Sequence, residues 1–268
     1  MHGSESDFAG SVPAIYDRYM VPLIFRPYAK LAAERVRDLQ PRRILETAAG
    51  TGVLTEELIA ALPEARIFAT DLNQPMLDEA VRRLPSSAIV FQQADALALP
   101  FEAGSFDFVI CQFGAMFFPD KVRANAEARR VLRDGGSYMM LIWNSIDRNL
   151  ATKVAGRAVA NLFPEGRTDF YERVPFSYFQ TRKIESDLVA AGFLDIAVET
   201  VELPSKAKSA RDAAIALIQG TPMRLEIEAG GEGMLITSTK EAELALRQFE
   251  TVEGFEAPMS AHLVLATK

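Results

Sequence analysis

The sequence predicts an α/β fold with a doubly wound, mostly parallel sheet of seven strands and an inserted helical lid. Three observations support this prediction. Short apolar segments alternate with amphipathic segments of about ten residues between positions 28 and 145, as in repeated βαβ units. Nearly every residue of the short segments is apolar, which is typical of parallel strands that helices cover on both faces. After Asn144 the alternation lapses, and mixed and mainly helical patterns follow.

The first half of the chain begins with a helical pattern over residues 28–39, in which Leu31, Ala32 and Val36 share one side. Pro41 has no N–H to donate, so it ends this helix. Regular alternation follows. The expected elements are strand 44–46, helix 54–61, strand 67–71, helix 76–84, strand 89–95, strand 106–113, helix 122–132 and strand 137–143.

The second half is less regular. Residues 145–183 are mixed in character and contain an aromatic cluster between Phe170 and Phe179. The glycine-rich segment 230–233 predicts a flexible break between two helices. The expected elements are helix 184–191, strand 195–201, helices 210–219, 223–229 and 241–250, and a final strand 262–267. We interpret residues 1–268 as one domain, with a cofactor-binding core over 28–143 and lid or substrate-binding segments over 145–183 and 205–257.

Composition and charge narrow the function classes. A hydrophobic content of 49% is sufficient for a large core. The net charge of −7 disfavours nucleic acid and anionic membrane surfaces as partners, because an acidic surface repels both. The chain has one cysteine, Cys111, and two histidines, so we expect neither an intramolecular disulfide nor a metal site.

Localisation and partners follow from similar observations. No apolar run approaches the roughly 18 residues of a membrane span, and the first residues lack the pattern of a signal peptide. We therefore expect a soluble, cytoplasmic protein without membrane insertion. A small-molecule substrate is the expected partner, and a homodimer is compatible with the sequence.

The most informative segment is residues 44–52, with the sequence ILETAAGTG. A short apolar strand ends in Glu46, passes through small residues, and reaches Gly50, Thr51 and Gly52 just before a helix. Glycine tolerates positive φ and lets the backbone approach a ligand closely, and the helix start offers unpaired N–H groups. This arrangement predicts a nucleotide-cofactor site.

Three further features lie at the carboxyl ends of the following strands, where open α/β sheets bind ligands. Asp71 ends the second strand and is suited to accept hydrogen bonds from both hydroxyls of a ribose. Asp95 and Ala96 end the third strand, where the acid suits an adenine amine and the alanine leaves room for the base. The tip of the fourth strand, residues 106–113, is expected beside the reactive end of the cofactor.

Together with Arg133-Asp134-Gly135-Gly136 before the fifth strand, these features resemble the class I S-adenosylmethionine-dependent methyltransferases. The resemblance is to the small-molecule branch that includes the ubiquinone/menaquinone biosynthesis methyltransferases. It covers residues 14–143 and extends less specifically to the last two strands. It implies a Rossmann-like methyltransferase fold, S-adenosyl-L-methionine as cofactor, and methyl transfer to a small acceptor that is apolar or aromatic.

The resemblance also implies a set of cofactor-binding residues. Glu46 corresponds to an acid near the methionine portion of the cofactor, and Ala48 stands where the family has a glycine. That alanine predicts either a wider loop or a backbone still at negative φ. Tyr16 and Tyr19 belong to a segment that resembles the N-terminal cap over the cofactor. The complete expected set is Tyr16, Tyr19, Glu46, Ala48, Gly50, Thr51, Gly52, Asp71, Leu72, Met76, Asp95, Ala96, Gln112 and Phe113.

Simpler interpretations stay open for several of these residues. Glu46 is also suited to cap the following helix or to bind loop amides, and Asp71 to cap the helix that begins near Pro75. Asp95 has the alternative of a solvated strand end. The residues with core packing as the alternative are Tyr16, Tyr19 and Met76.

Catalytic residues are harder to assign. Methyl transfer from a sulfonium requires alignment of the acceptor and exclusion of water, and a general base only if the nucleophile carries a proton. The sequence offers no convincing base, and His262 is a weak candidate for this role. Cys111 is expected to be a buried packing thiol. Candidates for lining an apolar acceptor cavity, with core packing as the alternative for each, are Met116, Phe117, Trp143, Phe176 and Tyr178.

Two other functions compete with methyl transfer. A nicotinamide-dependent oxidoreductase would use a G-x-G-x-x-G fingerprint, but Thr55 stands where its third glycine belongs. A non-catalytic protein that binds S-adenosylmethionine would keep the loop and the acids without turnover.

Overall fold

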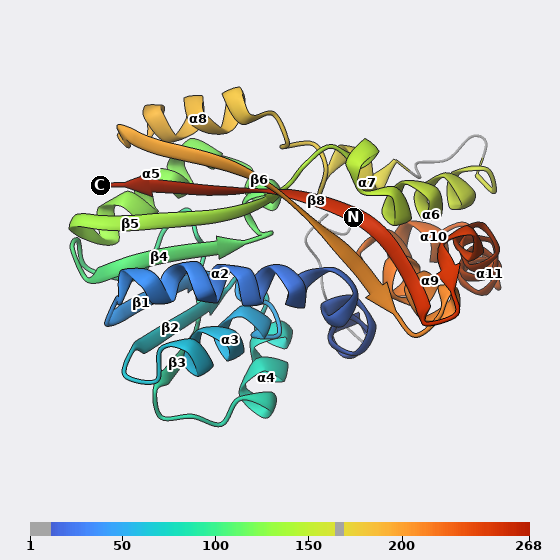
Figure 1. Cartoon of the computed structure of the whole chain (residues 1–268), viewed down its shortest axis with the longest axis horizontal. Helices are drawn as coiled ribbons and strands as arrows, with labels where there is room; N and C mark the ends of the chain where they lie inside the picture. Colours follow the sequence, from blue (N-terminus) through green and yellow to red (C-terminus); the bar gives the residue numbers. More distant parts are fainter. Residues whose placement is uncertain (1–11, 164–168) are drawn as a thin grey trace. The chain divides into compact units, whose positions relative to one another are not determined.

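The computed structural model describes residues 12–163 and 169–268, and the chain divides into two compact units. The first unit takes in the described residues of 1–27, 144–177 and 202–260, and the second takes in 28–143, 178–201 and 261–268. Figure 1 shows the course of the chain through its helices and strands. The segment expected to bind the cofactor, 28–143, lies entirely in the second unit. The division into a core and a lid stays a prediction.

The second unit is built on a sheet with the strand order β3-β2-β1-β4-β5-β8-β6 (Figure 1). The first five strands of this path pair in parallel, and β8 pairs antiparallel with β5. The strands are β1 Arg43–Thr47, β2 Arg66–Asp71, β3 Ile89–Gln93, β4 Phe106–Gln112, β5 Leu132–Trp143, β6 Asp195–Ala207 and β8 Gly254–Thr267.

The doubly wound, mostly parallel α/β architecture is therefore confirmed, with one correction to the strand number. Among the described residues the sheet has eight strands, because the two-residue strand β7, Glu250–Thr251, pairs with β8. Two residues carry too little pattern to be recognised as a strand in the sequence.

The registers of the parallel strands align their carboxyl ends. Thr47 of β1 pairs with Thr70 of β2 and with Cys111 of β4. One residue further along β2, Asp71 pairs with Gln93 of β3. The segments that leave these strands therefore begin at one edge of the sheet, which is where the features singled out in the sequence meet.

Helices cover both faces of this sheet. On one face, Tyr28 of α2 (Arg26–Leu39) makes an edge contact with Trp143 of β5, with ring centroids 5.6 Å apart. Tyr138 of β5 stacks at 5.8 Å on Phe193, which follows α8 (Thr181–Ala190). Positions 138 and 143 face opposite sides because side chains alternate along a strand. Helix α8 and α5 (Lys121–Val131) therefore cover the face opposite to α2.

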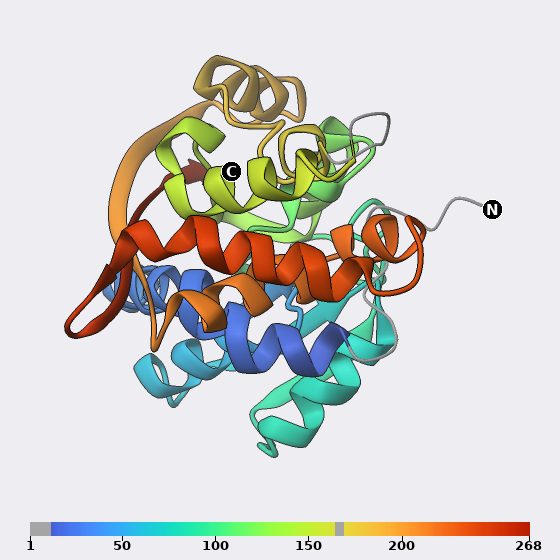
Figure 2. The same ribbon diagram turned by 90° about the vertical axis from the view of Figure 1, so that its right-hand side faces the viewer.

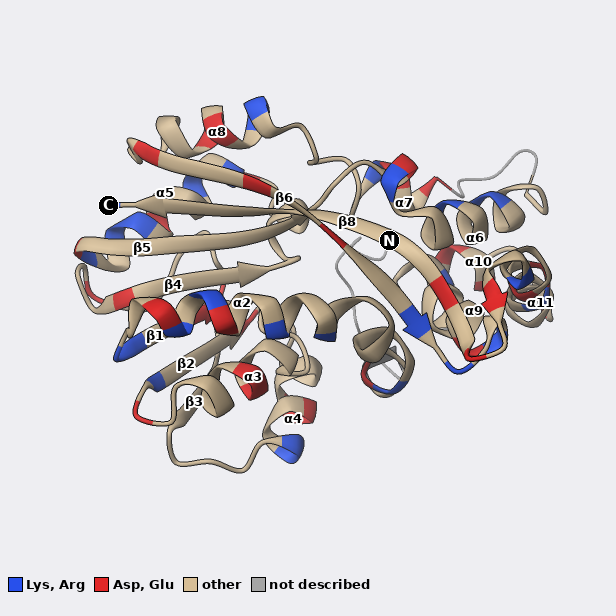
Figure 3. Cartoon of the chain, viewed as in Figure 1, with Lys and Arg blue, Asp and Glu red and all other residues tan. Residues whose placement is uncertain are grey.

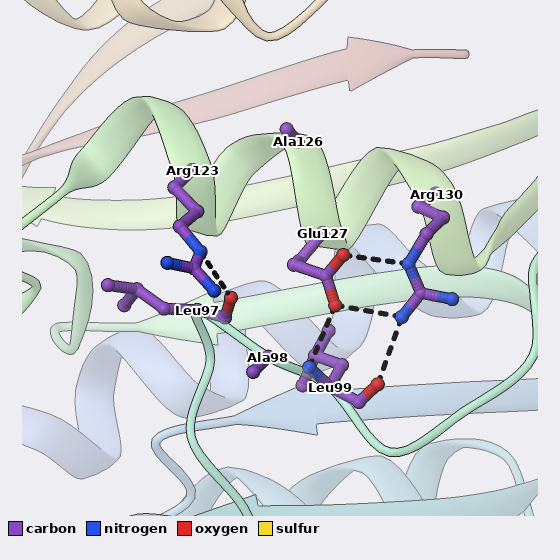
Figure 4. A pocket seen from close by; sticks show the side chains of 7 residues that line it. All are labelled: Leu97, Ala98, Leu99, Arg123, Ala126, Glu127 and Arg130. Carbon is purple, nitrogen blue, oxygen red and sulfur yellow. Dashed lines mark hydrogen bonds and ion pairs between the residues drawn. The ribbon is translucent and has the colours of Figure 1, made fainter.

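The connection between β3 and β4 contains no helix and is instead attached to α5 by side chains (Figure 4). The Arg123 Nε donates to the Leu97 carbonyl at 2.9 Å, and Glu127 accepts the Leu99 N–H at 2.8 Å. Arg130 donates to the Leu99 carbonyl at 2.9 Å and pairs with Glu127 at 2.7 Å. These side chains line a shallow surface pocket and satisfy main-chain groups that a helix would otherwise pair.

The first unit is mainly helical. Helix α11 packs against α9 and α6, and α9 packs against η1. Figure 2 shows α11 (red-orange), α9 (orange) and η1 (blue) side by side. The Tyr171 hydroxyl donates to the Leu217 carbonyl of α9. The helices are α1 Val12–Ile15, η1 Tyr16–Phe25, η3 Ile146–Arg148, α6 Leu150–Ala160, α7 Phe170–Arg173, α9 Ala210–Gln219, α10 Met223–Glu228, α11 Met234–Leu246 and η4 Arg247–Phe249.

Three expectations for the second half of the chain were wrong in their bounds. The strand expected over 195–201 continues to Ala207. The helix expected over 241–250 begins at Met234 and ends at Leu246, because Gly233 takes a positive φ of 79° and starts it. The final strand begins at Gly254 rather than at position 262. The remaining helices α3 (Val53–Ala61) and α4 (Gln74–Arg83) lie within two residues of their expected positions.

Charged residues of both signs are interspersed along the helices (Figure 3). Arg43 and Arg66 begin β1 and β2, at the end opposite to the acids Glu46 and Asp71. In the described part of the chain, no helix is both long and apolar enough to cross a membrane.

Candidate cofactor site at the carboxyl ends of the strands

The loop between β1 and α3 follows an unusual backbone path. Ala48, Gly50 and Gly52 have φ values of 54°, 57° and 81°, all in the left-handed region. The Ala49 N–H donates to the Thr70 carbonyl at 2.9 Å, and the Gly52 N–H donates to the Ala49 carbonyl at 3.0 Å. The loop is thus fixed to β2 and delivers Gly52 as the residue that precedes α3. The strand, tight glycine turn and helix start expected from the sequence are present.

The backbone conformation at Ala48 decides between the two alternatives that an alanine in place of the family's glycine left open. Its backbone has positive φ, so of the two alternatives, a wider loop or a negative φ, the second was wrong. An alanine in this region costs roughly 1–2 kcal/mol relative to ordinary φ. A Cβ placed on Gly114, just beyond β4, would lie 2.3 Å from the Ala48 Cβ and 3.0 Å from the Cys111 Sγ. Sequence reasoning missed Gly114, although a glycine directly after a strand tip was a usable signal.

Asp71 joins the glycine loop to the start of the next helix. It is 7% exposed, and its Oδ2 accepts the Gly50 N–H at 2.9 Å. Its Oδ1 accepts the Asn73 N–H at 2.8 Å and the Asn73 side-chain amide at 3.3 Å. Burial raises the pKa of Asp71, and the N–H donors of Asn73 and Gly50 oppose this effect. Asp71 therefore supports the loop directly, whether or not it also binds a ribose.

Glu46 is the second buried acid beneath the loop. It is 2% exposed, and its Oε2 accepts a hydrogen bond of 2.5 Å from the hydroxyl of Thr55 on α3. Burial raises its pKa to about 8; the Thr55 hydrogen bond lowers the pKa and the neighbouring Asp71 raises it. Because Glu46 binds a side-chain hydroxyl and not a main-chain N–H, it does not cap the main chain of α3.

The residues expected around an adenine differ in exposure. Met76 is 3% exposed and belongs to the core, whereas Leu72 is 54% exposed at the strand edge. Asp95 is exposed and accepts the Leu97 N–H at 2.8 Å, which forms a local turn. Ala96, beside it, is half-buried. Leu72 and Asp95 are thus accessible to a ligand, and Met76 serves packing.

At the tip of β4 the chain turns into an aromatic stack. Phe113 has a φ of 53°, and its ring stacks on Trp143 with centroids 3.8 Å apart and planes inclined by 8°. Tyr28 makes edge contacts with both rings. Gln112, the last residue of β4, is buried, and so are Phe113 and Trp143. The stack packs at the carboxyl end of β4. This is the core-packing alternative that the sequence left open for Phe113 and Trp143.

His262 lies within the sheet. It is 4% exposed, pairs with Ile142 across the β5–β8 register, and has its Nδ1 3.0 Å from the Thr200 hydroxyl. Because Ile142 and Trp143 face opposite sides of β5, His262 faces away from the Trp143 stack. Burial lowers its pKa, and the Phe179 main chain partly offsets this. These contacts assign it a packing position, and its catalytic role stays a prediction.

Tyr178 takes part in a polar cluster beside the segment after β4. Its hydroxyl donates to Asp187 of α8 at 3.0 Å, and Asp187 also pairs with Lys183 at 2.5 Å. The Lys121 ammonium lies 5.0 Å from the centre of the Tyr178 ring and donates to the Met116 carbonyl at 3.3 Å. Burial and Asp187 raise the pKa of Tyr178, so it stays protonated at neutral pH. Sequence reasoning did not identify Lys121 or Asp187.

The remaining candidates are placed as follows. Met116 is buried and Phe117 half-buried in η2, Ala115–Phe117. Tyr16 stacks on Phe25 at 5.1 Å within η1 of the first unit, and Tyr19 lies beside Arg18 in the same helix. Phe176 is also in the first unit and meets Tyr171 edge-on. The roles of these residues in binding cofactor or acceptor stay predictions.

Comparisons with known proteins bear on this geometry. Residues 44–136, from the glycine loop to the start of β5, match the family model described as "Methyltransferase domain". Over these residues the chain is similar to a methyltransferase domain. The Rossmann-like fold and the S-adenosylmethionine-dependent class that the resemblance implied are thereby confirmed. The nicotinamide-dependent alternative is left without support.

Curated relatives of the methyltransferase domain include proteins named for quinone biosynthesis. The demethylmenaquinone methyltransferase of Deinococcus radiodurans is 37% identical over 118 residues, which is 43% of this chain and 49% of the relative. The ubiquinone/menaquinone biosynthesis C-methyltransferase of Rhizobium johnstonii is 31% identical over 156 residues, 56% of this chain and 60% of the relative. The chain spans about half the length of the curated relatives it matches.

Solved structures share the fold at low identity. YcgJ of Bacillus subtilis superposes with a TM-score of 0.57 at 19% identity, covering 89% of this chain and 98% of that one. A phosphoethanolamine N-methyltransferase of Haemonchus contortus, solved with S-adenosylhomocysteine, gives a TM-score of 0.56 at 15% identity, covering 97% of this chain and 61% of that one. At these identities the likeness concerns the fold alone.

Proposed function

We propose that the chain binds S-adenosyl-L-methionine at the carboxyl ends of β1, β2 and β3 and transfers its methyl group to a small acceptor. The observation that carries this proposal is the bridge from Asp71 to Gly50 within a segment that matches a methyltransferase domain. A buried acid holds a loop of three left-handed residues against the strand ends. Such a loop gives a ligand close access to the backbone.

The residues present fit this cofactor. The Asp71 carboxylate suits a ribose hydroxyl, because its Oδ2 accepts only the Gly50 N–H and has a further lone pair, whereas its Oδ1 already accepts two donors of Asn73. Asp95 and Leu72 are accessible at the neighbouring strand ends, where an adenine amine and an adenine face would meet them. Glu46 beneath the loop suits a cationic group. When bound, the cofactor supplies a methyl group activated by a sulfonium.

The chain's own contribution to the reaction is alignment and exclusion of water. The stack of Phe113 on Trp143 holds the carboxyl end of β4 in place, beside the expected methionine portion of the cofactor. Met116 follows a few residues later, in η2. These apolar groups favour an acceptor that is itself apolar or aromatic. The names of the curated relatives, which refer to demethylmenaquinone and ubiquinone, support a quinone-like ring as the first acceptor class to test.

A binding experiment and a turnover experiment test this proposal separately. Calorimetric titration should show binding of S-adenosylmethionine and of S-adenosylhomocysteine, and no binding of NAD. Turnover should then be measured as formation of S-adenosylhomocysteine with demethylated quinols, phenols and amines. Binding without turnover on any acceptor would favour the non-catalytic alternative, and absence of cofactor binding would overturn the proposal.

The partner expectations also stay proposals. The net charge of −7 supports a small-molecule acceptor rather than nucleic acid. A homodimer is a separate possibility that sedimentation measurements would test.

A further inference from the structure

Two carboxyl groups on adjacent strands are buried beneath the glycine loop and interact electrostatically. Glu46 of β1 is 2% exposed, and Asp71 of the adjacent strand β2 is 7% exposed. No ion pair joins either acid to a lysine or arginine in the described part of the chain. Two charged carboxylates buried near each other without a counter-cation are unfavourable, so one of the pair is expected to hold a proton.

The hydrogen bonds decide which acid holds it. Asp71 accepts three N–H donors, from the Gly50 main chain and from the main chain and side chain of Asn73. Glu46 accepts one hydroxyl, from Thr55. Donated hydrogen bonds favour the charged form of a carboxyl group, so the negative charge belongs on Asp71 and the proton on Glu46.

The other neighbours of Glu46 do not change this assignment. On β4, the Cys111 thiol is buried, and burial raises its pKa to about 11, so it is neutral near pH 7. On α3, the group in contact is the Thr55 hydroxyl, which does not titrate. On β2, the group is Asp71, and its negative charge opposes ionisation of Glu46. The raised pKa of Glu46 agrees with the arrangement of donors.

We propose that Glu46 holds a proton in the ligand-free chain and releases it when a positively charged group of the cofactor enters the site. This inference rests on the proposed function. The O–H bond of the Glu46 carboxyl breaks, the proton passes to the solvent buffer, and the carboxylate that remains keeps the Thr55 hydrogen bond. The cation supplies the charge partner that the ligand-free site lacks, so Glu46 makes the site selective for a cationic ligand.

The test is the number of protons released on binding. S-adenosylmethionine is titrated calorimetrically near pH 7 in two buffers whose ionisation enthalpies differ. The wild-type chain should release about one proton per bound ligand, and its affinity should rise up to about tenfold from pH 6 to pH 7. In Glu46→Gln, proton release should disappear and the affinity should become nearly independent of pH. Glu64→Gln, on an exposed acid between α3 and β2, is the matched control and should behave as the wild type.

Two further arms keep the test decisive. S-adenosylhomocysteine keeps the amino group but lacks the sulfonium charge, so proton release with both ligands assigns the effect to the ammonium and release with S-adenosylmethionine alone assigns it to the sulfonium. Thr55→Val removes the donor to Glu46 and should shift the pH dependence of affinity upward, which provides a readout if Glu46→Gln does not fold. Tight binding without proton release in the wild type would overturn this inference and leave the proposed function standing. Absence of binding would overturn both.

Discussion

At the scale of single residues, Gly114 and Ala48 constrain each other at the edge of the sheet. Gly114→Ala places a Cβ 2.3 Å from the Ala48 Cβ, although the φ of −104° at position 114 suits an alanine. We expect a loss of about 2–3 kcal/mol in the free energy of unfolding, the upper range for overpacking. Ala48→Gly removes the obstructing Cβ and relieves the positive φ, so the loss caused by Gly114→Ala should shrink by at least about 1 kcal/mol in that background.

Urea denaturation of the four proteins in this cycle measures the coupling between the two positions. Equal losses from Gly114→Ala in both backgrounds would show that the Ala48 Cβ is not the obstacle. The remaining contact with the Cys111 Sγ, at 3.0 Å, limits how complete the rescue is.

Glu46 also gives stability a pH dependence of defined sign. Its pKa is about 8 in the folded chain against an ordinary value of 4.5, so the folded state holds the proton more tightly than the unfolded state. Its contribution to stability is therefore complete below pH 4.5 and is lost as the pH rises to about 8. The full loss, over about 3.5 pH units at about 1.4 kcal/mol each, is on the order of 5 kcal/mol, of which about 3 kcal/mol falls between pH 5.5 and 8.

The measurement is the unfolding free energy of the wild type and of Glu46→Gln between about pH 5.5 and 8.5. The difference between them isolates Glu46, because the other titrating groups are common to both. We expect the wild type to lose stability relative to the variant as the pH rises. A difference that is constant with pH would contradict a protonated Glu46.

At the scale of elements, α5 takes the place of a missing crossover helix for the connection between β3 and β4. Glu127→Ala removes the acceptor of the Leu99 N–H and the partner of Arg130. Since both side chains are partly exposed, we expect a stability loss of only about 1 kcal/mol. Hydrogen exchange should quicken at Leu97 and Leu99. Glu102→Ala, on an exposed acid of the same connection, should leave these amides unchanged.

The same connection carries Asp95 and Ala96, so its mobility has a consequence for binding. Because a looser connection costs entropy when the cofactor orders it, Glu127→Ala should weaken cofactor affinity several-fold. Titration with S-adenosylhomocysteine checks this. Quickened exchange without any change in affinity would mean that Asp95 and Ala96 are not part of the cofactor site.

Most elements between residues 28 and 143 were predictable, because each buried strand leaves a continuous apolar run and each helix a periodic one. The start of β5 was not, since it begins at Leu132 rather than at position 137, in a stretch of polar residues and glycines without an apolar run. Helix α6 was not predictable, because its buried positions are mostly small residues, among them Gly156. A Cβ added to Gly156 would lie 3.2 Å from a ring carbon of Tyr171. Small residues at the buried positions do not form a recognisable apolar pattern in the sequence. The sequence motifs also predicted the order in which the acids follow the strand ends.

The positive φ values of Ala48 and Phe113 were not readable, because intrinsic preference argues against them. Tertiary contacts overrule that preference, as the stack of Phe113 on Trp143 shows. For the same reason the sequence did not separate accessible Leu72 from buried Met76, since their exposure depends on the packing of α4.

At the scale of the whole molecule, the chain passes repeatedly between its two units. Each unit is assembled from separate stretches, and the boundaries at 201–202 and 260–261 fall within the continuous strands β6 and β8. A strand cannot lose its pairing in one unit without disturbing its continuation in the other. This connectivity argues for joint unfolding, in contrast to domains that are joined by a linker.

The single tryptophan makes this expectation measurable. Trp143 lies in the second unit, whereas far-ultraviolet circular dichroism also reports the helices of the first. We expect the fluorescence and dichroism transitions in urea to coincide, because β6 and β8 link the two units covalently within elements. S-adenosylhomocysteine at a hundred times its dissociation constant should shift both together, by about 2.7 kcal/mol. Separate midpoints, with only the fluorescence transition responding to ligand, would show that the helical unit unfolds independently of the cofactor-binding sheet.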